Sequence, residues 1–228
     1  NTTDARGASA LALAVATGVA LLASAPANAN DKLVELAKDP ANWVMTGRDY
    51  NEQNYSEMTD INKENVKKLR PAWSFSTGVL HGHEGTPLVV GDKMFVHTPF
   101  PNTTFALDLN EPGHILWQNK PKQNPTARTV ACCDVVNRGL AYWPGDDQVK
   151  PLIFRTQLDG HIVAMDAETG ETRWMMENSD IKVGSTLTIA PYVVKDSVIV
   201  GSSGAELGVR GYVTGYDVKT GQQLWRSY

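Results

Sequence analysis

The feature that most constrains this chain is a unit that recurs about every 50 residues. Each copy contains an apolar strand, a turn that begins with aspartate, and a second strand that carries a tryptophan. From aspartate to tryptophan the copies span residues 108–117, 166–174 and 217–225. The second and third turns read Asp-x-x-Thr-Gly, whereas the first carries Glu111-Pro112-Gly113 and one extra residue. A repeat of this length is typical of β-propeller blades.

The segments that precede these turns repeat as well. Residues 86–96 match residues 190–200, and both read as hairpins with a short polar turn. A four-stranded antiparallel blade cannot bury both of its faces alone, so neighbouring blades stack around an axis. We therefore predict an all-β fold in which residues 71–228 form about three blades of a propeller. We expect the repeat tryptophans to pack between blades, because large aromatic side chains commonly serve as core.

The first residues predict export. An apolar, alanine-rich run at residues 8–23 follows Arg6, and the small-residue pattern Ala27-x-Ala29 comes after it. The run is too short and too weakly apolar for a membrane span, so it indicates a secretory signal peptide, residues 1–29, cleaved after Ala29. No cysteine stands at the cleavage point, which argues against a lipoprotein. The net charge of -4 suggests neither nucleic acid nor an anionic membrane as a partner.

Residues 30–70 are polar and contain one weakly helical stretch, residues 61–69. We expect this N-terminal segment to wrap the propeller. Trp73 and Phe75 are expected to begin the first full strand of the propeller domain, residues 71–228.

One loop breaks the repeat. The turn aspartate follows its hairpin after 12 positions in the first two units, but after 17 positions between Val200 and Asp217. The extra residues fall within 202–211. Glycines in this loop allow a ligand to approach the backbone, serines and amides can bind carboxylates, and Glu206 offers a hard oxygen to a cation such as calcium. The alternative is a bulged turn with a solvated Glu206.

Cys132 and Cys133 are adjacent and are the only cysteines. Consecutive Cα atoms lie about 3.8 Å apart, below the usual disulfide range, so a bond between the pair would close a small strained ring. Such a ring cannot join distant segments, but it would offer a flat, polarizable surface to a planar ligand. The alternatives are two free thiols or intermolecular pairing, and the residues alone leave these readings open.

Charged residues near these features are further candidates. Arg138 lies five residues after the cysteine pair, and its guanidinium suits a bidentate contact with a ligand carboxylate, although a surface ion pair is the commoner role. Glu84 could accept hydrogen bonds from a ligand. His81 and His83 lack further ligands at suitable spacing and are weak evidence for a metal site.

With these residues in place, the chain resembles the large subunits of pyrroloquinoline quinone (PQQ) dependent methanol dehydrogenases, over the whole segment 30–228. Adjacent cysteines followed by Asp-x-x-Asn-Arg-Gly are the most specific match. The resemblance is carried by residues 69–78, 82–85, 131–139, 184–191 and 201–206.

The resemblance implies an eight-bladed propeller that holds PQQ near its axis, of which this chain is an N-terminal part. It implies a disulfide between Cys132 and Cys133 that forms one wall of the PQQ site, and it assigns Glu206 as a calcium ligand. The positions that match PQQ contacts are Glu84, Cys132, Cys133, Arg138, Thr188, Ser203, Gly204 and Ala205.

The family oxidises primary alcohols in the periplasm and passes electrons from PQQ to a cytochrome c. An aspartate acts as the catalytic base there, and it has no counterpart in this chain, so we expect this part alone to be inactive. The resemblance also implies a small β subunit in an α2β2 assembly.

Three alternatives remain at this point. Lanthanide-dependent methanol dehydrogenases and PQQ ethanol dehydrogenases share the architecture. The sequence of residues 186–191, however, is more similar to that of calcium-type methanol dehydrogenases. A cofactor-free propeller scaffold of the outer-membrane assembly type shares the repeats. Such a scaffold would have a lipid-modified cysteine at the cleavage site and no adjacent cysteine pair, and this sequence shows the opposite on both points.

Overall fold

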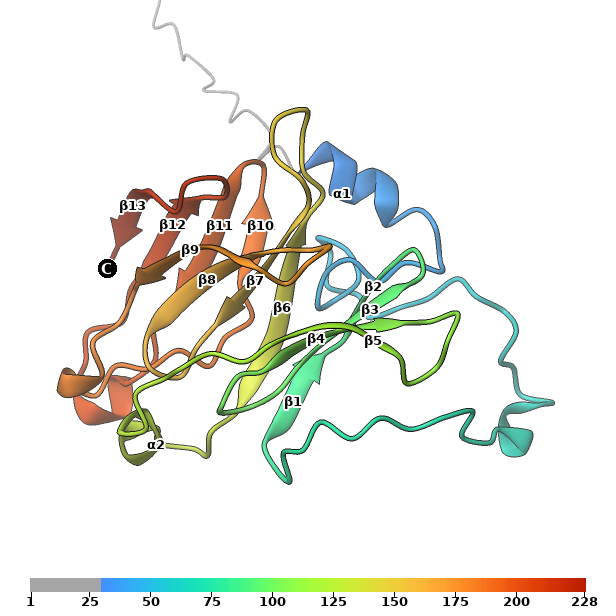
Figure 1. Cartoon of the computed structure of the whole chain (residues 1–228), viewed down its shortest axis with the longest axis horizontal. Helices are drawn as coiled ribbons and strands as arrows, with labels where there is room; N and C mark the ends of the chain where they lie inside the picture. The colour runs from blue at the N-terminus through green and yellow to red at the C-terminus, as the bar shows by residue number, and fades with distance from the viewer. Residues whose placement is uncertain (1–29) are drawn as a thin grey trace, which may run out of the picture.

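The computed structural model describes residues 30–228, so the predicted signal peptide, residues 1–29, lies outside the described residues. The regular structure of the described chain is mainly β-strand, arranged in three sheets (Figure 1). Blade 1 consists of β2 (Leu88–Val90), β3 (Lys93–His97), β4 (Thr104–Asp108) and β5 (Ile115–Asn119). Blade 2 consists of β6 (Asn137–Trp143), β7 (Leu152–Thr156), β8 (His161–Asp166) and β9 (Thr172–Glu177). Blade 3 consists of β10 (Tyr192–Val194), β11 (Ser197–Gly201), β12 (Val213–Asp217) and β13 (Gln223–Ser227).

Each blade is a four-stranded antiparallel meander, as the repeat predicts. The two predicted hairpins are β2–β3 and β10–β11. Their turns contain Gly91 at φ 56° and Lys195 at φ 53°, so in both hairpins the backbone reverses direction through a residue in the left-handed region. The blades of a partial propeller are therefore confirmed in residues 88–227.

One strand departs from this simple order. β1 (His83–Thr86) precedes blade 1 in the chain but pairs in parallel with β6 of blade 2, with His83 opposite Asn137 and Thr86 opposite Gly139. The register is irregular between these two pairs. The segment that leads into blade 1 is therefore hydrogen-bonded to the first strand of blade 2.

The tryptophans of the first two blades pack against the next blade, as expected. Trp117 and Trp174 are each only 8% exposed and belong to the main hydrophobic core. The indole Nε1 of Trp117 donates to the carbonyl oxygen of Ala167 at 3.0 Å. Small residues lie opposite the tryptophans across the strands: Ala106, Ala164 and Gly215. The small partners leave room for each indole to lie flat across its blade.

The N-terminal segment reaches all three blades. α1 (Asp31–Leu36) is capped by the Asn30 side chain and buries Leu33 completely. Trp43 forms an antiparallel bridge with Val89 of blade 1, and the Tyr50 hydroxyl donates to the carbonyl oxygen of Val193 in blade 3 at 2.8 Å.

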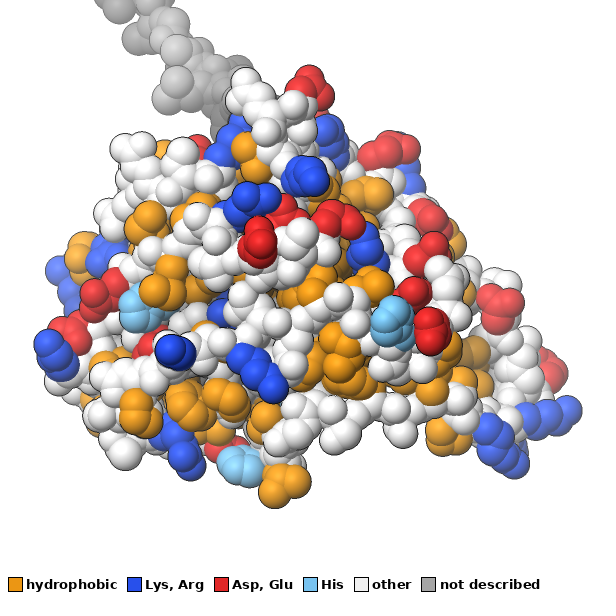
Figure 2. All heavy atoms as spheres, viewed as in Figure 1, with side chains coloured by type: hydrophobic (Ala, Val, Ile, Leu, Met, Phe, Trp, Pro, Cys, Tyr) orange, Lys and Arg blue, Asp and Glu red, His pale blue; other side chains and the backbone are white. Residues whose placement is uncertain are grey.

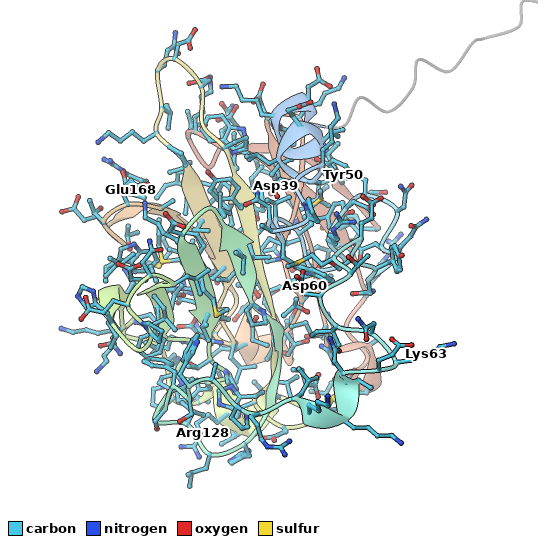
Figure 3. The ribbon with its side chains drawn as sticks, turned by 90° about the vertical axis from the view of Figure 1, so that its right-hand side faces the viewer. Asp39, Tyr50, Asp60, Lys63, Arg128 and Glu168 are labelled. Atoms are coloured by element: carbon cyan, nitrogen blue, oxygen red, sulfur yellow. A yellow bond between two sulfur atoms is a disulfide. The ribbon has the colours of Figure 1, made fainter. Side chains whose placement is uncertain are left out.

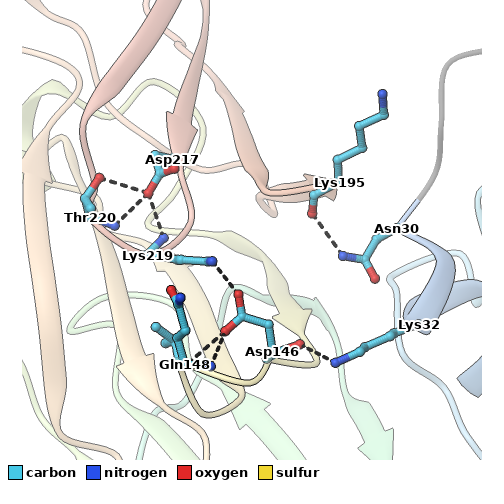
Figure 4. A network of polar contacts seen from close by, with 10 residues as sticks. Asn30, Lys32, Asp146, Gln148, Lys195, Asp217, Lys219 and Thr220 are labelled. Atoms are coloured by element: carbon cyan, nitrogen blue, oxygen red, sulfur yellow. Dashed lines mark hydrogen bonds and ion pairs between the residues drawn. The ribbon is translucent and has the colours of Figure 1, made fainter.

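A polar network holds the start of this segment (Figure 4). Lys32 Nζ donates to the carbonyl oxygen of Gly145 at 3.0 Å, and Asn30 Nδ2 donates to that of Lys195 at the same distance. Lys219 of blade 3 pairs with Asp146 in the β6–β7 loop. The division of the chain at residue 70 stays a prediction.

Two local expectations were wrong. Trp73 and Phe75 begin no strand: residues 69–82 contain none, because no neighbouring backbone within the described part of the chain pairs with them. Phe75 instead packs edge-on against Phe105. The weakly helical stretch 61–69 reduces to a single 3-10 turn, η1 (Val66–Lys68), because none of its residues is buried and it therefore lacks tertiary support.

Three further short helices lie in loops: α2 (Ala127–Val130), η2 (Ile181–Val183) and η3 (Ala205–Leu207). None of the helices in residues 30–228 is long and apolar enough to cross a membrane. On the face seen in Figure 2, acidic and basic side chains are interspersed with apolar ones, as the small net charge leads one to expect.

Candidate functional site

The candidate residues lie in loops and at the starts of strands, at one end of the blades. Figure 3 shows Arg128 of α2 at the end of the molecule opposite α1. α2 immediately precedes the cysteine pair, and β6 starts from the same end of blade 2 (Figure 1). α1 and the start of the N-terminal segment lie at the other end, away from these loops (Figure 1).

Arg138 is held between Glu84 of β1 and Thr188 of the segment that precedes blade 3. Its Nη2 lies 3.4 Å from Glu84 Oε2, and its Nη1 donates to Thr188 Oγ1 at 3.0 Å. The backbone N–H of Arg138 also donates to the carbonyl oxygen of Thr188 at 3.0 Å. The side chains of Arg138 and Glu84 are 52% and 50% exposed, so both remain open to a ligand.

The repeat explains why these three residues meet. Glu84 stands two residues before Thr86-Pro87, and Thr188 stands two residues before the matching Ala190-Pro191. Each therefore enters its blade at the same point, and Arg138, which begins blade 2, lies between them. The predicted residues Glu84, Arg138 and Thr188 are thus brought together directly.

The loop 202–211 joins this group through a short connecting segment, residues 184–188. Ser203 donates to the carbonyl oxygen of Thr186 from both its N–H, at 3.1 Å, and its Oγ, at 2.7 Å. The hydroxyl of Ser185 donates back to the carbonyl oxygen of Ser203 at 3.1 Å. Because the connecting segment ends at Thr188, it couples the position of the loop to that of Arg138.

Gly204 and Ala205 contribute backbone N–H groups rather than side chains to the candidate site. Gly204 has φ 115°, and a Cβ placed on it would lie 2.4 Å from the carbonyl oxygen of Gly184, so only glycine fits this position. Within residues 30–228 the N–H groups of Gly204 and Ala205 donate to no acceptor. The start of η3 therefore has two amide donors without acceptors, one on the buried Gly204 and one on the exposed Ala205.

Glu206 follows on η3 and is exposed. Its carboxylate forms no hydrogen bond or ion pair within the described part of the chain. No cluster of three side chains suited to a metal ion occurs among residues 30–228. Among the described residues, Glu206 therefore has no two partners of the His, Cys, Asp or Glu type with which it could hold a metal ion.

Cys132 and Cys133 are joined by a disulfide, which settles the alternatives that the residues alone leave open. Both cysteines are exposed. The loop behind them is fixed by a hydrogen bond from the N–H of Phe100 to the carbonyl oxygen of Val135 at 2.9 Å. No hydrogen bond or ion pair within the described residues joins this pair to Arg138.

His81 and His83 each contact other groups of the protein. His81 Nδ1 lies 2.9 Å from Asp134 Oδ2, and this hydrogen bond is the main reason why the pKa of Asp134 is lowered. His83 Nε2 lies 3.1 Å from the carbonyl oxygen of Val79 and 3.2 Å from Thr77 Oγ1. The His81–Asp134 pair connects the loop before β1 to the loop of the disulfide.

Sequence reasoning missed the buried polar residues behind the site. Asn137, Thr156 and Thr186 are at most 3% exposed, yet they hydrogen-bond the segments that carry Arg138, Thr188 and Ser203. Asn137 stands in the motif Asp-x-x-Asn-Arg-Gly, and Thr156 is a polar residue at the end of β7. Neither feature says which residues these two bind.

Known proteins similar to this chain show its family and its fold. Residues 43–227 match the family described as the PQQ β-propeller domain of glucose, ethanol and alcohol dehydrogenases. Over its whole length the chain is 88% identical to methanol dehydrogenase [cytochrome c] subunit 1 of Paracoccus denitrificans, of which it covers 36%. It is 54% identical to a lanthanide-dependent methanol dehydrogenase of Methylacidiphilum fumariolicum, over 89% of this chain and 32% of that protein.

A solved structure shows the same fold. A europium-containing methanol dehydrogenase superposes with a TM-score of 0.83 at 54% identity, over 87% of this chain and 34% of that chain. The chain spans about a third of the length of these relatives.

Proposed function

Because this chain belongs to the PQQ β-propeller family of alcohol dehydrogenases, we propose that it supplies the first blades and one side of the cofactor site of a periplasmic, PQQ-dependent methanol dehydrogenase. The substrates are methanol and other primary alcohols. The observation that carries the proposal is the half-exposed Arg138, held between Glu84 and Thr188, whose segment is hydrogen-bonded to the loop that carries two amide donors without acceptors.

The residues of the site fit PQQ, which is planar and carries three carboxylates. Arg138 keeps guanidinium donors for a carboxylate, and the N–H groups of Gly204 and Ala205 suit a second anionic oxygen. Glu84 can accept a hydrogen bond, and Thr188 and Ser203 complete the polar contacts. The exposed disulfide of Cys132 and Cys133 offers a rigid, polarizable surface on which a planar group can stack.

The same site fits one ligand of a hard cation. Glu206 is exposed and carries a charged oxygen, the type of ligand that calcium prefers. We propose calcium as the metal. A lanthanide is the second candidate, since it is also a hard cation and two relatives are named for such an ion.

The chemistry that the bound groups supply is two-electron acceptance from the alcohol by PQQ, assisted by a Lewis-acidic metal ion. In this proposal the residues of this chain bind PQQ and the metal ion and fix their orientation. Arg138 fixes the direction of the cofactor through its carboxylate, the disulfide excludes water from one face, and Glu206 holds the metal. No residue of this chain is proposed as the catalytic base, which is an aspartate elsewhere in the family.

The proposal extends to partners and location. Electrons pass to a cytochrome c, the acceptor printed in the name of the relative from Paracoccus denitrificans. A name that designates subunit 1 also implies a second subunit, which we propose is a small β subunit in an α2β2 assembly. Export by the predicted signal peptide, residues 1–29, places the protein in the periplasm.

The test uses a full-length protein that carries this chain. The apoprotein is titrated with PQQ in the presence of calcium, and methanol oxidation is followed with an artificial electron acceptor. Arg138→Gln should weaken PQQ binding about 10- to 100-fold, because a hydrogen bond between charged groups is lost. The control is Arg128→Gln, which removes an arginine from the same end of the molecule and should leave binding unchanged. Failure of the unmodified protein to bind PQQ would refute the proposed function.

A further inference from the structure

Behind Arg138 lies a buried polar group that the proposed contacts do not use. Asn137 and Thr156 are 1% and 0% exposed. Asn137 Nδ2 donates to Thr156 at both the carbonyl oxygen, at 3.1 Å, and Oγ1, at 3.0 Å. Thr156 Oγ1 in turn donates to the carbonyl oxygen of Ile189 at 2.5 Å. A chain of side-chain hydrogen bonds thus runs from the first strand of blade 2 to the entry of blade 3.

These hydrogen bonds are part of a closed ring. Asn137 precedes Arg138, Ile189 follows Thr188, and the N–H of Arg138 donates to the carbonyl oxygen of Thr188 at 3.0 Å. The ring therefore passes through both residues that meet at the candidate site. A shift of blade 2 against residues 188–189 would break at least one hydrogen bond of this ring.

Asn137 also fixes the backbone on either side of Arg138. Its Oδ1 accepts a hydrogen bond from the N–H of Gly139 at 3.0 Å and so spans Arg138. Gly139 has φ 132°, and its Cα lies close to Gly85 of β1, the strand that carries Glu84. One buried amide thus holds the start of β6 in the conformation in which Arg138 faces Glu84 and Thr188.

We propose that Asn137 and Thr156 are positioning residues, which hold Arg138 and Thr188 in register and thereby set the affinity of the site for PQQ. This inference rests on the proposed function. The two residues touch no ligand themselves. They act because a buried polar ring has few alternative arrangements: a displaced donor or acceptor would remain unpaired away from water.

The test compares substitutions in the full-length apoprotein. Thr156→Val keeps the shape but removes the hydroxyl, whereas Thr156→Ser keeps the hydroxyl. The matched control is Thr214→Val, since Thr214 is also 0% exposed and its Oγ1 accepts a hydrogen bond from Arg226 Nε, which is not part of the ring. Hydrogen exchange of the Arg138 amide is measured without PQQ, and the dissociation constant of PQQ is measured by titration.

Thr156→Val should accelerate exchange of the Arg138 amide and weaken PQQ binding about tenfold, the effect of losing one net hydrogen bond. Thr156→Ser should restore both, and Thr214→Val should lower the unfolding temperature without changing either. Unchanged exchange and affinity in Thr156→Val, or equal losses in Thr214→Val, would overturn the positioning role. If the unmodified protein does not bind PQQ, the proposed function fails, while the exchange data still test the ring.

Discussion

The indole Nε1 of Trp174 donates a hydrogen bond to the carbonyl oxygen of Val218 at 2.9 Å and so joins the last strand of blade 2 to the turn of blade 3. In the same turn Gly221 lies against the face of the indole, where an added Cβ would come within 2.8 Å of the ring. Trp117 and Gly170 repeat this arrangement between blades 1 and 2. The glycine of the Asp-x-x-Thr-Gly turn is therefore required for packing between blades as well as for the turn.

The first prediction separates these two requirements. Gly221→Ala should lower the free energy of unfolding by about 2–4 kcal/mol, because it combines a left-handed alanine with overpacking against Trp174. Gly91→Ala is the control: Gly91 also has a positive φ, but nothing lies within 4 Å of its added Cβ. It should cost only about 1 kcal/mol. Urea unfolding of the full-length protein measures both, and equal losses would contradict a packing role for Gly221.

The second prediction concerns the cysteine pair. In exported protein the peptide that contains Cys132 and Cys133 should be lighter by about 2 Da before reduction, because one bond replaces two thiol hydrogens. Mass measurement with and without reductant decides this, with alkylation before reduction as the control. Complete alkylation of both thiols in unreduced protein would rule out the intramolecular bond.

The third prediction is a dependence of stability on pH. His161 Nδ1 lies 3.0 Å from Asp159 Oδ1, and this hydrogen bond raises the pKa of His161 above 6.5 against the opposing effect of burial. A raised folded-state pKa means that protonation stabilises the fold. The contribution is fully present below pH 6.5 and is lost as the pH rises through the folded-state pKa.

His161→Gln should therefore remove part of the loss of stability that the unmodified protein shows above pH 6.5. Urea unfolding from about pH 5.5 to 9 measures the slope. His114→Gln is the control, because His114 faces Glu111 in an exposed pair at 3.4 Å and should contribute little. Identical slopes in the unmodified protein and in His161→Gln would show that the Asp159 contact does not stabilise the fold.

The fold was predictable because a propeller repeats one local pattern. Every blade contains its own hairpin, aspartate turn and tryptophan strand within about 50 residues, so strand pairing inside a blade follows from the sequence. The parallel pairing of β1 with β6 was not predictable, since it joins residues 83–86 to a strand of a different blade. The segment around Trp73 and Phe75 was misread for a similar reason: aromatic residues favour a strand, but a strand forms only beside a partner.

The candidate site was predictable in part. The inserted loop stood out because it breaks the repeat, and Arg138 because it follows the cysteine pair. The contact of Arg138 with Glu84 and Thr188 joins residues that are at least 50 positions apart in the chain, which spacing alone does not place together. The ring through Asn137 and Thr156 was invisible, because buried polar residues reveal their partners only in the folded structure.

The last prediction concerns Glu206 and is made in the full-length protein. Glu206→Gln keeps the size of the side chain but removes its negative charge, so calcium affinity should fall and activity at limiting calcium should fall with it. PQQ should still bind, because its proposed contacts with Arg138 and with the amides of Gly204 and Ala205 are unchanged. If Glu206 were only a solvated turn residue, the substitution should change stability by no more than about 0.5 kcal/mol and leave activity intact.

The measurement is methanol oxidation across a calcium titration, with bound PQQ followed by its absorbance. Glu64→Gln provides the control, because Glu64 is also an exposed carboxylate but lies in the N-terminal segment. Its calcium dependence should match that of the unmodified protein. A repeat of the titration with a lanthanide distinguishes the two candidate metals, since the ion that restores activity at the lower concentration is the better fit. An unaltered calcium dependence in Glu206→Gln would show that Glu206 is not a metal ligand. The only proposed role of loop 202–211 would then be to bind PQQ through the amides of Gly204 and Ala205.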